Sequence, residues 1–197
     1  MPTDQEKQPI LAWHFLPPDG RMQFGERIAV TAGETYRVEP PLDLCRRGLH
    51  ASVRAIDALE YAPGPIVCRV EMTGEVVHGP DKLCATERRV LAMADATTTL
   101  HEFACDEAEA TLDRERAAGR EPDPRSWAAV EAKRAWLRHE IDDQALAAAS
   151  YAAWDAASDA AWDAASDAAS DAASDAACER LEARLAKLLG LAEGGAA

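Results

Sequence analysis

The second half of the chain contains a long stretch without glycine or proline, and this limits what it can fold into. The stretch runs from Arg125 to Leu189, and one continuous helix of that length would be about 96 Å long at 1.5 Å per residue. The polar sequence DDQ at 142–144 is a point where the helix could break. The sequence therefore predicts either one long helix or two stacked helices. A separate helix is expected over 97–119, because threonines can cap its start and Gly119 can end it.

A repeat of four residues, with an aspartate at every fourth position and alanines between, fills part of this stretch. Four residues turn a helix by about 400°, so the aspartates would form a right-handed spiral with about 6 Å between neighbours. Neighbouring aspartates repel by roughly 0.2–0.5 kcal/mol per pair, and alanine, the best helix former, offsets this cost. The candidate binding residues of the repeat are Asp155, Asp159, Asp163, Asp167, Asp171 and Asp175, together with Trp154 and Trp162.

Three interpretations of the repeat are open. It could be a solvated, alanine-rich spacer that grew by slippage of a short DNA repeat. It could pack closely against another helix, because alanine lets backbones approach and 178–189 carries leucines at core spacing; the result would be a hairpin or a homo-oligomer formed through the C-terminal helix. It could also mimic nucleic acid in part. One carboxylate per ~6 Å is far below the one charge per about 1.7 Å of a duplex, so several bundled helices would mimic it better.

The charge of the chain is strongly negative and unevenly distributed. Of the formal net charge of −14, residues 1–95 contribute −3 and residues 96–197 contribute −11. Phosphate repels such a protein, so direct nucleic-acid binding is disfavoured. A basic protein surface, or a protein that itself binds nucleic acid, is the favoured partner.

The cysteines and the absence of targeting signals indicate the compartment. The chain has 5 cysteines, and an odd number without a signal peptide predicts free thiols in a reducing environment. No apolar run of about 18 residues is present, so no membrane span is expected. The sequence therefore predicts a cytoplasmic protein of a bacterium or of a phage-infected bacterial cell.

The composition changes near residue 96 and predicts an α+β fold with distinct parts. Residues 8–95 hold most of the prolines and most of the β-branched residues, which indicates a compact mixed domain. Residues 97–190 are expected to form an alanine-rich helical hairpin or rod. The glycine- and alanine-rich end, 191–197, is expected to be a disordered tail.

Within the first domain the sequence predicts several elements. The segment 65–79 alternates between apolar and polar residues, as a strand does. A short helix is expected within 48–64, where apolar residues recur at helical spacing before a Pro-Gly stop. A hairpin is expected over 26–40 around Ala32-Gly33, and another short helix over 85–96.

The histidines and cysteines match no strong metal or catalytic motif. Cys45 with His50, or Cys68 with His78, lie close in sequence, but neither spacing fits a zinc site built from paired C-x₂-C motifs. The G-x-S-x-G, P-loop and H-E-x-x-H motifs are absent. We therefore expect structural cysteines and histidines, no metal and no cofactor bound through such motifs.

Residues 10–93 contain Asp19-Gly20, Cys45 followed by Gly48 to Ser52, and later Asp81-Lys82. With these motifs the range resembles an uncharacterised domain family that is common in phages and prophages and often carries alanine-rich repetitive tails. Its members share Asp-Gly, then C-x-x-G-L-H-A-S, then A-L-x-Y-A-x-G, and then a strand that leads to Asp-Lys. The matching residues are Asp19-Gly20, Cys45, Gly48 to Ser52, Ala58-Leu59, Tyr61-Ala62, Gly64, Val70, Gly74, Val76 and Asp81-Lys82. This resemblance implies little about function.

Residues 45–77 read CRRGLHASVRAIDALEYAPGPIVCRVEMTGEVV: a Gly–apolar–aromatic–small run leads into a short helix that ends in Tyr-Ala, and a strand that ends in Gly-Glu follows. About thirty residues of this segment resemble ADP-ribosyltransferase-like domains. That resemblance implies an NAD site formed by an early His or Arg, a middle Tyr or Ser and a late Glu. His14 (or Arg21) would be the early residue, His50 stands where the family usually has Tyr, and Glu87 is the candidate for the late Glu. An imidazole can hydrogen-bond a ribose. In the alternative interpretation, "GLHAS" is a turn glycine followed by a helix cap, with His50 exposed or satisfied locally.

The sequence thus supports two functions of different classes. The first is a phage-type accessory protein whose acidic helical arm binds another protein, for example as an anti-CRISPR-like inhibitor of a defence complex. The second is an NAD-dependent ADP-ribosyltransferase-like enzyme that modifies a protein or nucleic acid. No cofactor is expected for the first, and NAD for the second.

Overall fold

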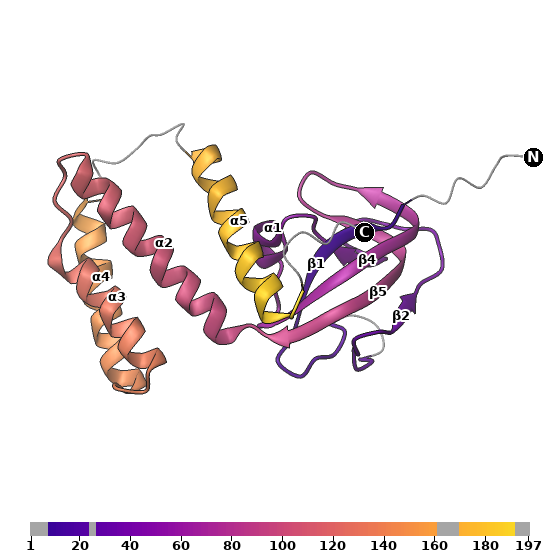
Figure 1. Cartoon of the computed structure of the whole chain (residues 1–197), viewed down its shortest axis with the longest axis horizontal. Helices are drawn as coiled ribbons and strands as arrows, with labels where there is room; N and C mark the ends of the chain where they lie inside the picture. The colour runs from indigo at the N-terminus through magenta and orange to yellow at the C-terminus, as the bar shows by residue number, and fades with distance from the viewer. Residues whose placement is uncertain (1–7, 24–26, 161–169, 192–197) are drawn as a thin grey trace, which may run out of the picture. The chain divides into compact units, whose positions relative to one another are not determined.

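The chain forms two compact units. One combines residues 1–97 with residues 178–197, and the other spans residues 98–177. The computed structural model describes residues 8–23, 27–160 and 170–191. The fold class is α+β, as predicted, with strands in the first part of the chain and helices after them (Figure 1). Among the described residues, every helix is too short or too polar to span a lipid bilayer.

The first unit is built around an antiparallel sheet of 5 strands. In chain order these are β1 (Ile10–Leu16), β2 (Thr35–Arg37), β3 (Leu49–Ala51), β4 (Ile66–His78) and β5 (Leu83–Asp95). The long strands β4 and β5 form a central hairpin, and β1 pairs with the other edge of β4. The short strands β3 and β2 pair with successive parts of β5, so the first half of β5 has a partner on each side.

A backbone bridge between Trp13 and Ser52 joins the two edges of this sheet. The Trp13 N–H donates to the Ser52 carbonyl at 2.7 Å, and the Ser52 N–H donates to the Trp13 carbonyl at 3.0 Å. Strand pairing therefore runs from β1 through β4, β5 and β3 back to β1, and the sheet curls around one apolar core. The buried core residues are Ala12, Leu16, Val30, Leu49, Ala51, Cys68, Val70, Met72, Leu83, Ala85 and Val90.

The outer face of the sheet is covered by α1 (Ala55–Glu60) and by residues 178–188 of α5 (Ser170–Leu188), which lie side by side in Figure 1. Leu181 and Leu185 of α5 are both 0% exposed. Glu182 of the same helix accepts a hydrogen bond from the Ala55 N–H at the start of α1, at 2.9 Å. The chain therefore returns to its first unit after the helical unit, and the C-terminal helix completes the first unit's core.

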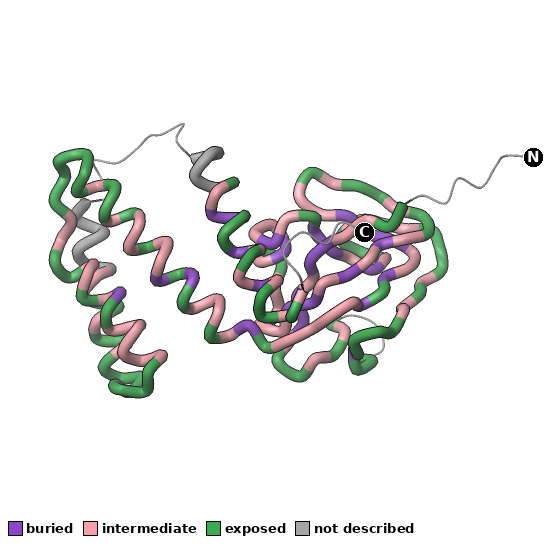
Figure 2. The backbone as a smooth tube through the Cα atoms, viewed as in Figure 1, coloured by how far each residue is buried: buried purple, intermediate pink, exposed green. Residues whose placement is uncertain are grey.

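The second unit contains α2 (Thr97–Ala117), α3 (Pro124–Leu137) and α4 (Asp143–Ala160). Asp123 caps α3 by accepting from the Arg125 N–H at 2.8 Å, and Pro124 occupies the first turn. The Arg134 guanidinium joins α3 to α2 through Asp106 (2.7 Å) and Glu109 (2.6 Å). The apolar side chains of this unit are mostly alanine, and few of the positions whose burial is described are fully buried (Figure 2).

The structure confirms several sequence predictions. The strand predicted over 65–79 is β4, and the helix predicted over 97–119 is α2. The break expected near 142–144 lies between α3 and α4. The short helix expected within 48–64 is α1, although it is only 6 residues long. The expected tail over 191–197 lies outside the described residues except for Leu191.

Two predictions about the first unit were wrong. The segment 85–96 is not a helix but most of β5, because pairing with strands on both sides outweighs its helix-favouring composition. The segment 26–40 is not a hairpin: Ala29 bridges to Arg21, and β2 pairs with β5 instead.

Candidate functional site

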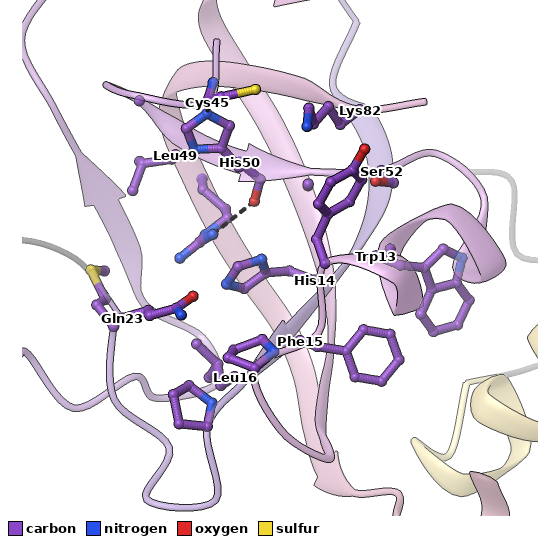
Figure 3. A pocket seen from close by; sticks show the side chains of 18 of the residues that line it. Trp13, His14, Phe15, Leu16, Gln23, Cys45, Leu49, His50, Ser52 and Lys82 are labelled. Carbon is purple, nitrogen blue, oxygen red and sulfur yellow. Dashed lines mark hydrogen bonds between the residues drawn. The ribbon is translucent and has the colours of Figure 1, made fainter. Parts of the chain in front are cut away.

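A pocket of about 670 Å³ opens in the first unit, on the core side of β1 (Figure 3). Its walls come from β1, β3, β5, α1 and the loops that precede β2 and β3 or follow α1 and β4. Apolar and aromatic side chains form most of the surface, and a smaller polar set is placed among them. The polar lining residues are His14, Gln23, Cys45, Arg46, His50, Ser52, Tyr61, Lys82 and Arg88.

His14 projects from β1 into this pocket. Alternation along the strand places it on the opposite side from Trp13 and Phe15, and Figure 3 shows its ring turned away from them. Burial, and then the charges of Arg88 and His50, lower the pKa of His14 well below its ordinary value. The ring is therefore a neutral imidazole near pH 7, with one N–H donor and one acceptor nitrogen.

His50 lies on β3 and is held by its own loop. Its Nε2 accepts a hydrogen bond from the Cys45 N–H at 3.0 Å. Burial is the main cause that lowers the pKa of His50; a hydrogen bond to the Gly48 backbone acts in the opposite direction. The accepting nitrogen is therefore occupied by the protein, and the half-buried ring offers its remaining surface to the pocket.

Arg88 is a lining residue that sequence reasoning did not select. It lies on β5 with 3% of its surface exposed, and one of its terminal nitrogens donates to the His50 carbonyl at 2.9 Å, the bond that is dashed in Figure 3. Burial lowers its pKa to about 10. The signal was an arginine at an inward position of a strand, and it was hidden because the segment was interpreted as a helix.

Glu87, the predicted late glutamate, lies elsewhere. It is the neighbour of Arg88 on β5 and therefore faces the other side of the strand. Its carboxylate pairs with Arg37 of β2 at 3.1 Å and accepts a bond from the Thr73 hydroxyl at 3.4 Å. The structure brings His14 and His50 together with Arg88, and it keeps Glu87 out of the pocket. None of the described residues that line the pocket is Asp or Glu.

The mouth of the pocket carries further positive charge. The Lys82 ammonium lies 3.8 Å from the centre of the Tyr61 ring, and the Tyr61 hydroxyl donates to Asp81. Hydrogen bonds to Tyr61 and then Cys45 are the main causes that raise the pKa of Lys82, so it is charged near pH 7. Arg46 is a further lining residue and is exposed.

The candidate binding residues of the tetrad repeat lie mainly where side chains are not described. Asp155 and Asp159 fall on the backbone of α4, and Asp171 and Asp175 on that of α5. Only the Asp175 side chain is described, and it is exposed. Trp154 belongs to α4 without a described side chain, and the residues outside the described part of the chain are Trp162, Asp163 and Asp167.

The cysteines and the possible metal ligands can be compared with the sequence predictions at the described residues. All five cysteines are free, as predicted, and four of them are buried. Within residues 8–23, 27–160 and 170–191, no group of three or more His, Cys, Asp or Glu side chains is arranged to hold a metal ion.

Fold and site together define a small, curled antiparallel domain with a cationic pocket, completed by a C-terminal helix. Residues 19–102 match the model of a family described as "Domain of unknown function (DUF7666)". The expected resemblance to an uncharacterised domain family is therefore confirmed for this range. The match includes His50 and Arg88 but not β1 with His14, nor α5. No curated protein and no solved structure matched the chain.

Proposed function

We propose that the first unit binds NAD or a closely related dinucleotide in the pocket between β1 and β3. The observation that carries the proposal is the convergence of His14 and His50, the two residues placed in an NAD site by sequence resemblance, with Arg88 in one pocket of about 670 Å³. A pocket of this size, with an apolar lining and a few polar groups, is typical of sites for cofactor-sized molecules.

The lining residues support distinct roles in such a complex. The neutral His14 ring can donate to and accept from a ribose hydroxyl or a carboxamide. The Tyr61 ring, 47% exposed at the mouth, offers a face on which a base can stack. The cations Arg88 and Lys82 complement the negative charge of a pyrophosphate.

The proposal is a binding function rather than a transfer reaction. In the ADP-ribosyltransferase-like scheme a glutamate contacts the ribose and activates the acceptor, and Glu87 is paired with Arg37 away from the pocket. The described lining residues supply no other carboxylate. The pocket therefore has groups that recognise the dinucleotide but lacks, among these residues, the group that the reaction requires.

Isothermal titration calorimetry of the full chain with NAD tests the proposal. We expect saturable binding that His14→Ala weakens by about tenfold or more, because a hydrogen bond to the ligand is lost. His78→Ala is the matched control, since His78 is exposed on β4 and does not line the pocket. Absence of binding heat at millimolar NAD, or an equal effect of both substitutions, would refute the proposal.

We propose a second function for the acidic helical unit, which is to bind a basic protein surface. The observation behind it is electrostatic: residues 98–177 have a formal net charge of −11, and five of the six arginines in this range already have acidic partners. These arginines are Arg116, Arg120, Arg125, Arg134 and Arg138. The surplus carboxylates favour a cationic partner, for example the nucleic-acid-binding surface of a defence nuclease.

Charge neutralisation on the full chain tests this second function. Asp155, Asp159, Asp163 and Asp167 are changed together to Asn, and binding to an oligolysine peptide is measured at 50 and 300 mM salt. The control changes four exposed glutamates of the first unit to Gln, namely Glu34, Glu39, Glu60 and Glu75. We expect salt-sensitive binding that only the first variant weakens. Equal weakening by both variants would show that the total charge of the protein, rather than the acidic helical unit, attracts the peptide.

A further inference from the structure

Arg88 is a buried cation of the first unit that has no acidic partner among the described residues. Its side chain is 3% exposed, and its one hydrogen bond given by the structure goes to a neutral acceptor, the His50 carbonyl. The Nε atom is buried without a hydrogen-bond partner among the described residues. No carboxylate of the described chain pairs with it. Buried charges in proteins are normally paired, so this arrangement requires an explanation.

The described groups that act on the charge of Arg88 supply no carboxylate. The groups that act on its charge are Cys68 and Tyr36, and burial raises the pKa of the Cys68 thiol to about 12, so the thiol is neutral. Burial lowers the pKa of His14 and of His50, so both rings resist protonation. Among the described lining residues the positive side chains are therefore Arg46, Lys82 and Arg88, and of these only Arg88 is buried.

We propose that Arg88 is an anion subsite at the buried end of the pocket and that it selects ligands by a phosphate or pyrophosphate group. A guanidinium presents its N–H donors in a planar fork that matches two phosphate oxygens. Binding would give the buried charge its missing partner. The inference rests on the proposed function, because it assigns recognition of the dinucleotide's pyrophosphate to one side chain of the same pocket.

The pocket combines cationic side chains with a larger apolar surface, and this combination indicates the class of ligand. A free inorganic anion would use Arg88 and leave the rest of the pocket of about 670 Å³ empty. A phosphate ester would place its anion at Arg88 and its organic part against the apolar walls and the Tyr61 ring. We therefore assign the subsite to an organic pyrophosphate, and inorganic pyrophosphate serves as the probe for the anion alone.

Calorimetric titrations of the full chain with NAD, ADP-ribose, inorganic pyrophosphate and nicotinamide riboside test the inference. Nicotinamide riboside lacks phosphate, and we expect it to bind about 10- to 100-fold more weakly than NAD, which is the usual effect of losing charge-assisted hydrogen bonds. Arg88→Met should lower the affinity for NAD to that for the riboside. Arg89→Met is the matched control, since Arg89 is the next residue on β5, is exposed and pairs with Glu71; it should leave both affinities unchanged.

The outcomes separate this inference from the proposed function. If NAD and nicotinamide riboside bind wild-type protein equally well, the subsite is refuted and NAD binding stands. If ADP-ribose and pyrophosphate bind in an Arg88-dependent way and NAD does not, the subsite is supported and the NAD function is refuted. If none of the four binds, both are refuted. If Arg88→Met does not fold, two measurements still test the subsite. One is the NAD affinity of Arg88→Lys, which keeps the charge without the planar fork of donors, and the other is the comparison of the ligands on wild-type protein.

Discussion

Replacing Arg88 by methionine should leave the unliganded protein as stable as the wild type, or make it more stable. Burial holds the pKa of Arg88 at about 10, which is about two to three pH units below that of a free guanidinium. Since each pH unit corresponds to 1.36 kcal/mol, the buried charge costs about 3 kcal/mol at neutral pH. Methionine removes this cost and is flexible enough to fill the space of the arginine stem.

The substitution also has a cost, which sets the expected net effect. The His50 carbonyl loses the bond from Arg88, which is 2.9 Å long, and a buried acceptor without a partner costs about 1–3 kcal/mol. The free energy of unfolding should therefore rise by between about 0 and 2 kcal/mol. A residue kept for ligand binding is expected to behave in this way, because functional groups are often retained at the expense of stability.

Urea denaturation followed by far-ultraviolet circular dichroism, without ligand, measures this effect. Arg89→Met is again the control: its ion pair with Glu71 is exposed and 3.5 Å long, so its removal should change stability by less than about 1 kcal/mol. A loss of more than about 3 kcal/mol in Arg88→Met would refute the reasoning. It would mean that the guanidinium is a structural element of the core, and that the anion subsite is unnecessary to explain it.

Three further predictions concern stability. Leu185→Ala should destabilise the protein by about 2–5 kcal/mol because Leu185 is 0% exposed, whereas Leu188→Ala, at a position 38% exposed, should have a much smaller effect in the same urea assay. The pKa of His14 is lowered in the folded state, so the free energy of unfolding should be constant above about pH 6.5 and should fall at lower pH, because the unfolded chain then binds a proton that the folded chain does not. Thermal midpoints measured from pH 7 to 5 check this. An equally steep fall in His14→Gln would contradict it. Gly48→Ala should destabilise by about 1–3 kcal/mol, because φ is +141° and the new Cβ would lie 2.9 Å from the Cβ of Cys84; an unchanged urea midpoint would contradict this.

The sequence was most informative where one local pattern determines the structure. The alternation over 65–79 predicts β4 because one face of that strand is buried in the core and the other is only partly covered. The cap at Asp123 and the polar break before α4 are likewise local signals, and the structure has both. In each case the residues of the element itself carry the signal, although β4 also pairs with β1 and β5.

The element that the sequence could not reveal is β5, and with it Arg88. The segment 85–96 is rich in Glu, Arg, Leu, Ala and Met, which favour helices in isolation. Its strand conformation comes from pairing with β4 on one side and with β2 and β3 on the other. An arginine on a surface helix is ordinary and indicates no site, whereas an arginine at an inward position of a central strand is a buried charge. The missing site residue and the wrong secondary structure are thus one error, caused by long-range pairing.

The return of α5 to the first unit determines how the two proposed functions can be separated. A truncation that removes the tetrad repeat and everything after it would also remove Leu181 and Leu185 from the first unit's core. It would remove Glu182 as well, which holds the start of α1, and α1 contributes Ala58 to the wall of the pocket. Loss of NAD binding in such a variant would therefore report a damaged pocket rather than a role of the acidic arm. Neutralising the aspartates keeps the C-terminal helix in place, so with that design NAD binding by the pocket and protein binding by the acidic helical unit can be lost independently.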